Sequence, residues 1–366
     1  MIKVLLRKII APSQRDFIRF RIIKIIFYFK FCRILKSLII TKKKLVGCLI
    51  NKKDIEKKIS VSYLIFDYQR LFGSFKNINR TRKFYLRLLT KSKLEKNVHN
   101  IISAKIELGD FENIVNIENI KDVNQKLLVN FINNKQNHNF DIINKNFYKL
   151  INNKSIAVVG PAKSLIHNGK EIDDFDYVVR INVLPSDKTK LILDKPETGL
   201  RTDIIYYNDA MVISWEKLIM NPKNIAWNVF KNKKNYEKYI ETTGTKTCSW
   251  QSGLNFKTGG GANMVLNILF DLLKYNPKEI KIFNADFWYN GFNYMKSYQD
   301  HIKMNNDQRL FVKELRQHDA FFNYQIVKKI LNNKKVKIDK VGLEPMNVGI
   351  EAYAKKLDKF FENDTY

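Results

Sequence analysis

Three consecutive glycines stand in front of an apolar stretch of the chain, and their position favours the binding of an anion. Thr258, Gly259, Gly260 and Gly261 directly precede apolar residues that recur at helical spacing. The first turn of a helix leaves its N–H groups without acceptors, and the helix dipole places partial positive charge there. Glycine lets the backbone approach a ligand closely, at a cost in chain entropy. We therefore expect an anion at this helix end, rather than a surface loop without a ligand.

Two further polar segments follow apolar runs. Residues 160–165, Gly-Pro-Ala-Lys-Ser-Leu, end the run 155–160, so backbone amides and the Ser164 hydroxyl could meet a nucleotide there. The same residues could also form an ordinary β-turn. Arg180 and Asn182 end another run as R-x-N. An amide side chain at that position can hydrogen-bond a base or a ribose, and the alternative is that both residues cap loops.

Familiar phosphate and metal motifs are absent from the sequence. Residues 160–170 lack the second glycine before a Lys-Ser/Thr pair that a P-loop requires, and no G-x-G-x-x-G follows an apolar run. No histidines or cysteines have metal-ligand spacing, and neither C-x-x-C nor H-E-x-x-H occurs. These absences argue against Walker-type NTPases and dinucleotide oxidoreductases, and we expect neither a metal nor a cofactor.

Strand and helix patterns alternate from about residue 154 onward. Short apolar or β-branched runs, typical of buried parallel strands, occupy 155–160, 176–182, 201–208, 278–286 and 335–339. Helical spacing occupies 258–277 and 309–331. The alternation predicts an α/β domain with a doubly wound, mostly parallel sheet, whose binding sites lie beyond the carboxyl ends of the strands.

Together these segments resemble the sialyltransferases of glycosyltransferase family 29, in a bacterial-type form. The short sialylmotif is similar to residues 257–287, and the histidine of the very short motif, H-x-x-x-x-E, is similar to His318. The resemblance covers roughly residues 154–331. The residues that match the long sialylmotif in order are Gly160, Gly169, Glu171, Ile172, Asp173, Asp176, Arg180, Asn182, Arg201 and Thr202.

This resemblance implies a metal-independent, inverting transfer of sialic acid or a related ulosonic acid, such as Kdo, from a CMP-sugar to a glycan hydroxyl, on a GT-A-like variant sheet. His318 would take the proton of the acceptor hydroxyl, a task that suits an imidazole near neutral pH. Asp286 and His301 are candidates for a contact to the acceptor or the phosphate. The residues expected to bind the donor are Gly160, Ser164, Asn182, Asn208, Thr258, Gly259 and Gly260.

The chain departs from the family pattern at several positions. Pro161 and Ala162 stand where the family has Asn-Ser, Asn323 stands in place of the glutamate of the very short motif, and no clear H-Y-Y motif is present. The chain has 3 cysteines, and Cys248 lacks the partner that links the motifs in secretory relatives. Because so few cysteines cannot form a disulfide framework, we expect a reducing, cytoplasmic location.

The positive charge of the chain is concentrated near its beginning. The 366 residues carry 65 Lys and Arg against 36 Asp and Glu, a net charge of +29, and 45% of them are hydrophobic, which excludes a disordered polyelectrolyte. Residues 1–60 carry 17 Lys and Arg against 3 acidic residues, a net +14, and residues 61–100 add +7. Most of the excess therefore belongs to the first hundred residues.

Three regions follow from these patterns: a basic amphipathic helical segment at 1–60, a helical region at 61–150 and a sialyltransferase-like catalytic domain at 151–366. Cations interrupt every apolar run of the first region well short of the ~18 residues that span a bilayer. We expect this region either to contact the anionic cytoplasmic face of a membrane or to pack on the catalytic domain.

Two other functions remain open from the sequence alone. One is a nucleic-acid-binding or scaffold protein with a degenerate nucleotide-binding fold, although the aromatic residues of the first region cluster with Ile and Leu rather than forming spaced stacking platforms. The other is a transferase that uses a UDP- or GDP-sugar. We expect a CMP-sugar donor and a glycan or glycolipid acceptor as partners, and no nucleic acid.

Overall fold

The structure is a computed structural model, and it describes part of the chain. The expected segment 1–60, the glycines 259–261 with Thr258, and His301 lie outside the described residues, as does most of 61–150. The described residues are 83–87, which are helical, and 145–182, 185–187, 190–191, 195–208, 225–251, 262–291, 294–295, 315 and 318–362.

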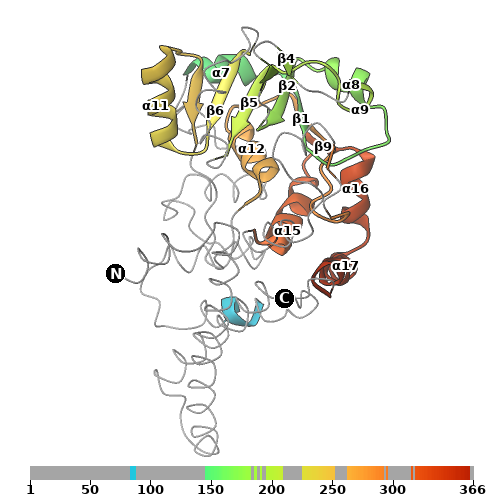
Figure 1. The fold of residues 1–366 in the computed structure, drawn as a ribbon. Coiled ribbons are helices and arrows are strands. Elements are labelled where there is room, and N and C mark those ends of the chain that lie inside the picture. Colours follow the sequence, from blue (N-terminus) through green and yellow to red (C-terminus); the bar gives the residue numbers. More distant parts are fainter. Residues whose placement is uncertain are drawn as a thin grey trace, which may run out of the picture.

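Seven parallel strands form the central sheet (Figure 1). They are β1 (Ser155–Val159), β2 (Tyr177–Ile181), β5 (Ile204–Tyr207), β6 (Trp227–Phe230), β7 (Cys248–Trp250), β8 (Glu279–Phe283) and β9 (Val336–Ile338). Their order across the sheet is β7-β6-β5-β2-β1-β8-β9, and every neighbouring pair is parallel. The order reverses between β1 and β8, which is the point where open α/β sheets bind ligands. Two short strands, β3 (Pro185–Asp187) and β4 (Lys190–Leu191), form a separate antiparallel pair.

Helices cover both faces of this sheet (Figure 1). On one face, Ile156 and Val158 pack in the largest core cluster with α7, α12 and α15. On the other face, α8 packs near β1 and β2, and α11 packs near β5 and β6. The helices are α7 (Lys145–Ile151), α8 (Gly169–Asp173), α9 (Lys195–Thr198), α11 (Lys233–Thr243), α12 (Met264–Leu273), α15 (Ala320–Ile330), α16 (Lys340–Asn347) and α17 (Ile350–Glu362). The predicted α/β class and the parallel sheet are confirmed.

Helix α12 is apolar on most of its surface because it lies inside the protein. Eight of its ten residues are buried, and its N-cap Asn263 accepts a hydrogen bond from the Leu266 N–H group at 2.8 Å. Such a cap satisfies one of the N–H groups that the first turn leaves without an acceptor. The helix ends shortly before Pro277, which cannot continue it. This burial fixes the start of α12 at the carboxyl edge of the sheet.

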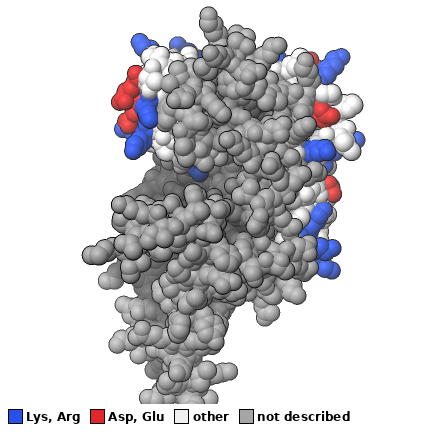
Figure 2. Space-filling view, in the orientation of Figure 1, with Lys and Arg blue, Asp and Glu red and all other residues white. Residues whose placement is uncertain are grey.

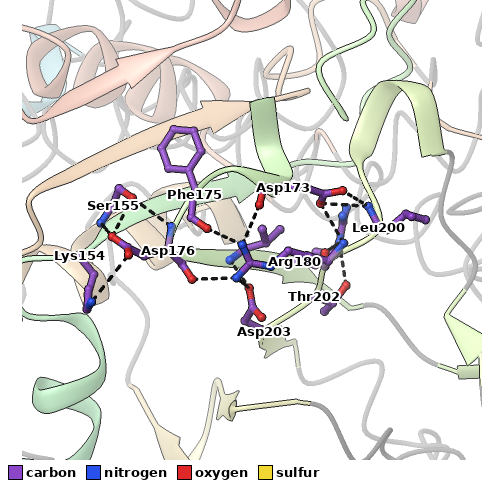
Figure 3. A network of polar contacts seen from close by, with 11 residues as sticks. Lys154, Ser155, Asp173, Phe175, Asp176, Arg180, Leu200, Thr202 and Asp203 are labelled. Atoms are coloured by element: carbon purple, nitrogen blue, oxygen red, sulfur yellow. Dashed lines mark hydrogen bonds and ion pairs between the residues drawn. The ribbon is translucent and has the colours of Figure 1, made fainter. Parts of the chain in front are cut away.

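A polar network joins the segments around β1, β2 and β5 (Figure 3). The Arg201 guanidinium donates to the carbonyl oxygens of Asp173 and Phe175 at 2.7 and 2.6 Å. It also donates to the Asp203 carboxylate at 3.0 Å, which in turn accepts the N–H group of Val178. Hydrogen bonds donated by a charged guanidinium are stronger than hydrogen bonds between neutral groups. Arg201 therefore holds the loop between α8 and β2 against the start of β5.

Arg180 belongs to the same network and points away from the carboxyl edge of the sheet. Its buried guanidinium donates to the Thr198 carbonyl oxygen at 2.7 Å and to the Thr202 hydroxyl at 2.9 Å. Burial lowers the pKa of Arg180 to about 10, and the charges of Asp173 and Asp203 oppose that effect. Arg180 and Thr202 therefore bind one another, and the Asp173 carboxylate accepts the N–H groups of Leu200 and Arg201, so these residues fix loops.

On the face shown in Figure 2, the charged side chains of the described part are of both signs. In the view of Figure 2, basic and acidic side chains alternate along its outer edge and form no continuous basic area. In the parts of the chain that the structure describes, every helix is too short or too polar to cross a bilayer.

Candidate functional site

A cavity of about 360 Å³ opens at the carboxyl edge of the sheet. Residues that follow β1, β2, β5, β6 and β8 line it, together with the start of α12. Neighbouring strands lie about 4.8 Å apart, so the ends of these five adjacent strands span about 19 Å. The cavity is therefore long enough for an extended ligand, and it includes the point where the strand order reverses.

Asn182 and Asn208 meet in the middle of this cavity. The Asn182 side-chain oxygen accepts the backbone N–H group of Asn208 at 2.8 Å. Asn182 has a φ of +51°, a left-handed conformation that asparagine tolerates better than most residues, and it ends β2 there. The residue is 1% exposed, yet its carboxamide nitrogen makes no hydrogen bond among the described residues. Two N–H groups of Asn182 thus remain to bind a ligand.

The start of α12 forms another part of the wall. Asn263, Met264 and Val265 line the cavity, and the first-turn N–H groups of Met264 and Val265 have no acceptor within their own helix. The predicted residues Thr258 to Gly260 precede this helix in the chain but lie outside the described residues. Of the expected anion site, the structure therefore describes only the first turn of α12. This turn offers N–H donors at the positive end of a helix.

A strained loop follows β8 and carries the carboxylate of the site. Phe287 and Trp288 have φ angles of +50° and +66°. Residues other than glycine rarely adopt positive φ angles, and this conformation costs energy at each residue. The fully buried Asp286 carboxylate accepts the N–H groups of Trp288 at 3.2 Å and Asn290 at 3.1 Å. Burial raises the pKa of Asp286 to about 6, against the lowering effect of these hydrogen bonds. Asp286 thus binds the loop into its strained conformation.

Helix α17 holds the same loop from outside the cavity. The Tyr353 hydroxyl donates to the Phe287 carbonyl oxygen at 2.6 Å, and Lys356 donates to the Asn290 side-chain oxygen at 3.0 Å. Burial raises the pKa of Tyr353 well above its usual value, so the hydroxyl stays protonated and remains a donor. A sequence motif does not reveal this contact, because it joins residues 66 positions apart.

His318 lies at the β8 end of the cavity. Its ring stacks on Trp288 with 5.2 Å between the ring centroids. Tyr294, which pairs with Ala162, also lines the cavity. The next residue, Asp319, is the N-cap of α15. Asn323 is fully buried and accepts the Asn263 N–H group at 2.8 Å. That hydrogen bond connects the start of α12 to α15. The side-chain oxygen of Asn323 is the acceptor, and a glutamate at this position could also accept a hydrogen bond.

Gly160 and Ser164 are not among the residues that line the cavity. A Cβ atom at Gly160 would lie 2.4 Å from the carbonyl oxygen of Asn284, so glycine allows the turn after β1 to approach the end of β8. Ser164 accepts the Ile166 N–H group at 2.9 Å and shapes its own loop. The backbone after β1 reaches the cavity instead through Pro161 and Ala162.

Sequence reasoning missed Lys231, Trp288 and Tyr294, which all line the cavity. Lys231 directly follows β6, and a strand predicted at 227–230 would have placed it at the same edge as Asn182. Of the residues that the structure describes, no group of three or more His, Cys, Asp or Glu side chains could hold a metal ion.

No protein-family model matches the chain, and no curated protein matches it either. The geometry of this cavity and the residues that line it are therefore the basis for a proposed function.

Proposed function

We propose that the chain is a glycosyltransferase, similar to sialyltransferases, which moves sialic acid or a related ulosonic acid such as Kdo from a CMP-sugar to a glycan hydroxyl. The observation that carries the proposal is the composition of one elongated cavity. Hydrogen-bond donors from Asn182 and the start of α12 line its middle, and His318 lies at its β8 end. A sugar nucleotide needs both kinds of group within one site.

The donor would lie across the strand ends. Asn182 and Asn208 would bind the cytidine and ribose, because both line the cavity and an amide side chain can both donate and accept hydrogen bonds. The first-turn N–H groups of α12 would face the phosphate. Preorganised N–H groups stabilise the charge that develops on a leaving phosphate, and they do so without a metal ion. The sheet that positions these groups would be a GT-A-like variant.

His318 would act as the general base. Stacking on Trp288 fixes the plane of the imidazole, and a fixed base can take the proton of an acceptor hydroxyl as that oxygen attacks. The oxygen forms the new bond at the anomeric carbon, the bond to the phosphate oxygen breaks, and CMP leaves with the electron pair. Attack on the face opposite to CMP inverts the configuration. Asp286 would shape the loop that carries Trp288, because backbone N–H groups already bind both of its oxygens.

Nucleotide binding and transfer test this proposal together. A thermal-shift panel of CMP, UMP, GMP and AMP in EDTA should raise the melting temperature with CMP alone. Purified protein should release CMP from CMP-sialic acid or CMP-Kdo under the same conditions. His318→Ala should abolish transfer and spare CMP binding, whereas His167→Ala, at an exposed side chain outside the cavity, should spare both. Absence of CMP binding and of CMP release in the wild type would refute the proposal.

Residues 1–60 would hold the protein at the anionic cytoplasmic face of a membrane. Their net charge of +14 supports this part of the proposal. Co-sedimentation of the full chain with phosphatidylglycerol vesicles should fall steeply as salt rises, and phosphatidylcholine vesicles should bind little. Equal binding to both vesicles would contradict an electrostatic contact.

A further inference from the structure

We propose that Lys231 is the anion-binding residue at the β6 end of the cavity and that it selects ligands with a charged oxygen group, either the phosphate or the carboxylate of the donor. This inference rests on the proposed function, since it assigns a role within the same site. It concerns a residue that the family resemblance does not include.

The sheet fixes the position of Lys231. Its backbone N–H group donates to the Tyr207 carbonyl oxygen at 3.2 Å, so the ladder between β5 and β6 continues through this residue. Side chains alternate along a strand, which places Lys231 on the same side as Trp227 and Val229. Both of those residues pack in the core cluster that contains α12. Lys231 therefore leaves the sheet on the face where α12 begins and where the cavity lies.

The charge of Lys231 has no counter-charge in the described part of the chain. The residue is partly buried and lines the cavity, yet its ammonium group forms no ion pair or hydrogen bond with a described residue. Two other lysines of the domain are paired with carboxylates, Lys274 with Asp271 and Lys337 with Glu279. A cation that loses part of its hydration without gaining a partner is costly, and a bound anion offsets that cost.

The remaining polar groups of the cavity favour the same sign of ligand. Among the described lining residues Asp286 is the single carboxylate, and it follows β8, about 19 Å from the end of β6 by strand spacing. Asn182, two strands from Lys231, supplies an amide nitrogen that makes no hydrogen bond to a described residue. The middle of the cavity and its β6 end thus offer donors and positive charge, and these bind an anion rather than a neutral sugar.

Binding measurements with matched variants test the assignment. Lys231→Gln removes the charge inside the cavity, and Lys234→Gln removes the same charge from an exposed position at the start of α11. The probes are cytidine, CMP and the unreactive 3-fluoro analogue of CMP-sialic acid, titrated by calorimetry into the full chain. We expect Lys231→Gln to raise the Kd of the analogue at least about tenfold, as for the loss of a charge-assisted hydrogen bond, and Lys234→Gln to change it less than twofold. The Kd of cytidine should not change.

The two anion sources give different patterns. A rise in Kd for both CMP and the analogue identifies the phosphate as the partner of Lys231, and a rise for the analogue alone identifies the carboxylate. Lys231→Arg keeps the charge and should bind within about threefold of the wild type, which separates loss of charge from damage to the fold. Equal Kd values for the two glutamine variants would overturn the assignment and leave the proposed function intact. A wild-type protein that binds neither CMP nor the analogue would overturn both.

Discussion

Replacement of Asp286 by asparagine tests whether the strained loop contains a carboxyl group with a raised pKa. The carboxylate is fully buried, and its pKa is about 6 instead of 3.8. Each pKa unit corresponds to about 1.4 kcal/mol, so the folded protein favours the protonated form by roughly 3 kcal/mol more than the unfolded chain does. Asparagine keeps the size and one acceptor of this side chain and cannot titrate.

The direction of the pH effect follows from proton binding. Between pH 4 and pH 6 the folded state keeps a proton on Asp286 that the unfolded state releases, so stability from this group is complete below about pH 4. It is lost as the pH rises through about 6. Between pH 4 and pH 7.5, the free energy of unfolding of the wild type should therefore fall by about 3 kcal/mol relative to that of Asp286→Asn, since each pKa unit is about 1.4 kcal/mol.

Urea unfolding at a series of pH values measures this difference, with tryptophan fluorescence as the signal. The matched control is Asp174→Asn, which removes an exposed carboxylate beside α8 and should change stability by less than about 0.5 kcal/mol at each pH. A constant difference between the wild type and Asp286→Asn from pH 4 to pH 7.5 would refute the reasoning, because burial would then impose no penalty on the charged carboxylate.

Three further substitutions probe the framework around the cavity. Gly160→Ala should lower the melting temperature in differential scanning fluorimetry and weaken CMP binding, because its Cβ atom would lie 2.4 Å from the Asn284 carbonyl oxygen; unchanged values would contradict that close approach. Arg201→Met should cost about 2 to 3 kcal/mol in urea unfolding by leaving carbonyl and carboxylate acceptors without their donor. Tyr353→Phe should cost about 1 kcal/mol and increase hydrogen exchange at the loop that includes Phe287; unchanged exchange there would show that α17 does not hold the loop.

Much of the sheet was predictable because its strands are buried on both faces. The runs at 155–160 and 201–208 contain β1 and β5, whose residues are buried with almost no exposed positions. Such strands need continuous apolar sequence, so the pattern alone identifies them. The helix predicted within 258–277 is confirmed as α12, for the same reason.

The elements between β5 and α12 were not predictable from the same pattern. β6 has four residues, and Asn228 interrupts its apolar run because that side chain accepts a hydrogen bond from the Tyr207 hydroxyl. Strand β7 has three residues, too few to show a period. Because the sequence pattern does not predict β6, it also does not place Lys231, which follows β6, at the carboxyl edge of the sheet. The resemblance singled out Asn182, Asn208, Asp286 and His318, and the structure places all four at the cavity. The contact of Tyr353 with the loop after β8 depends on packing between distant segments, which no motif shows.

The pairing of β1 with β8 has a consequence for the order in which the protein forms during synthesis. Ser155 pairs with Glu279, and 124 residues separate them. At about 5 to 20 residues per second, the ribosome completes β8 some 6 to 25 s after β1. Throughout that interval one edge of β1, whose last four residues are apolar, has no neighbour, and such an edge readily pairs with other chains. The cavity at the β1 and β8 ends can therefore assemble only after most of the domain has been synthesised, and until then the free edge of β1 is open to wrong pairing.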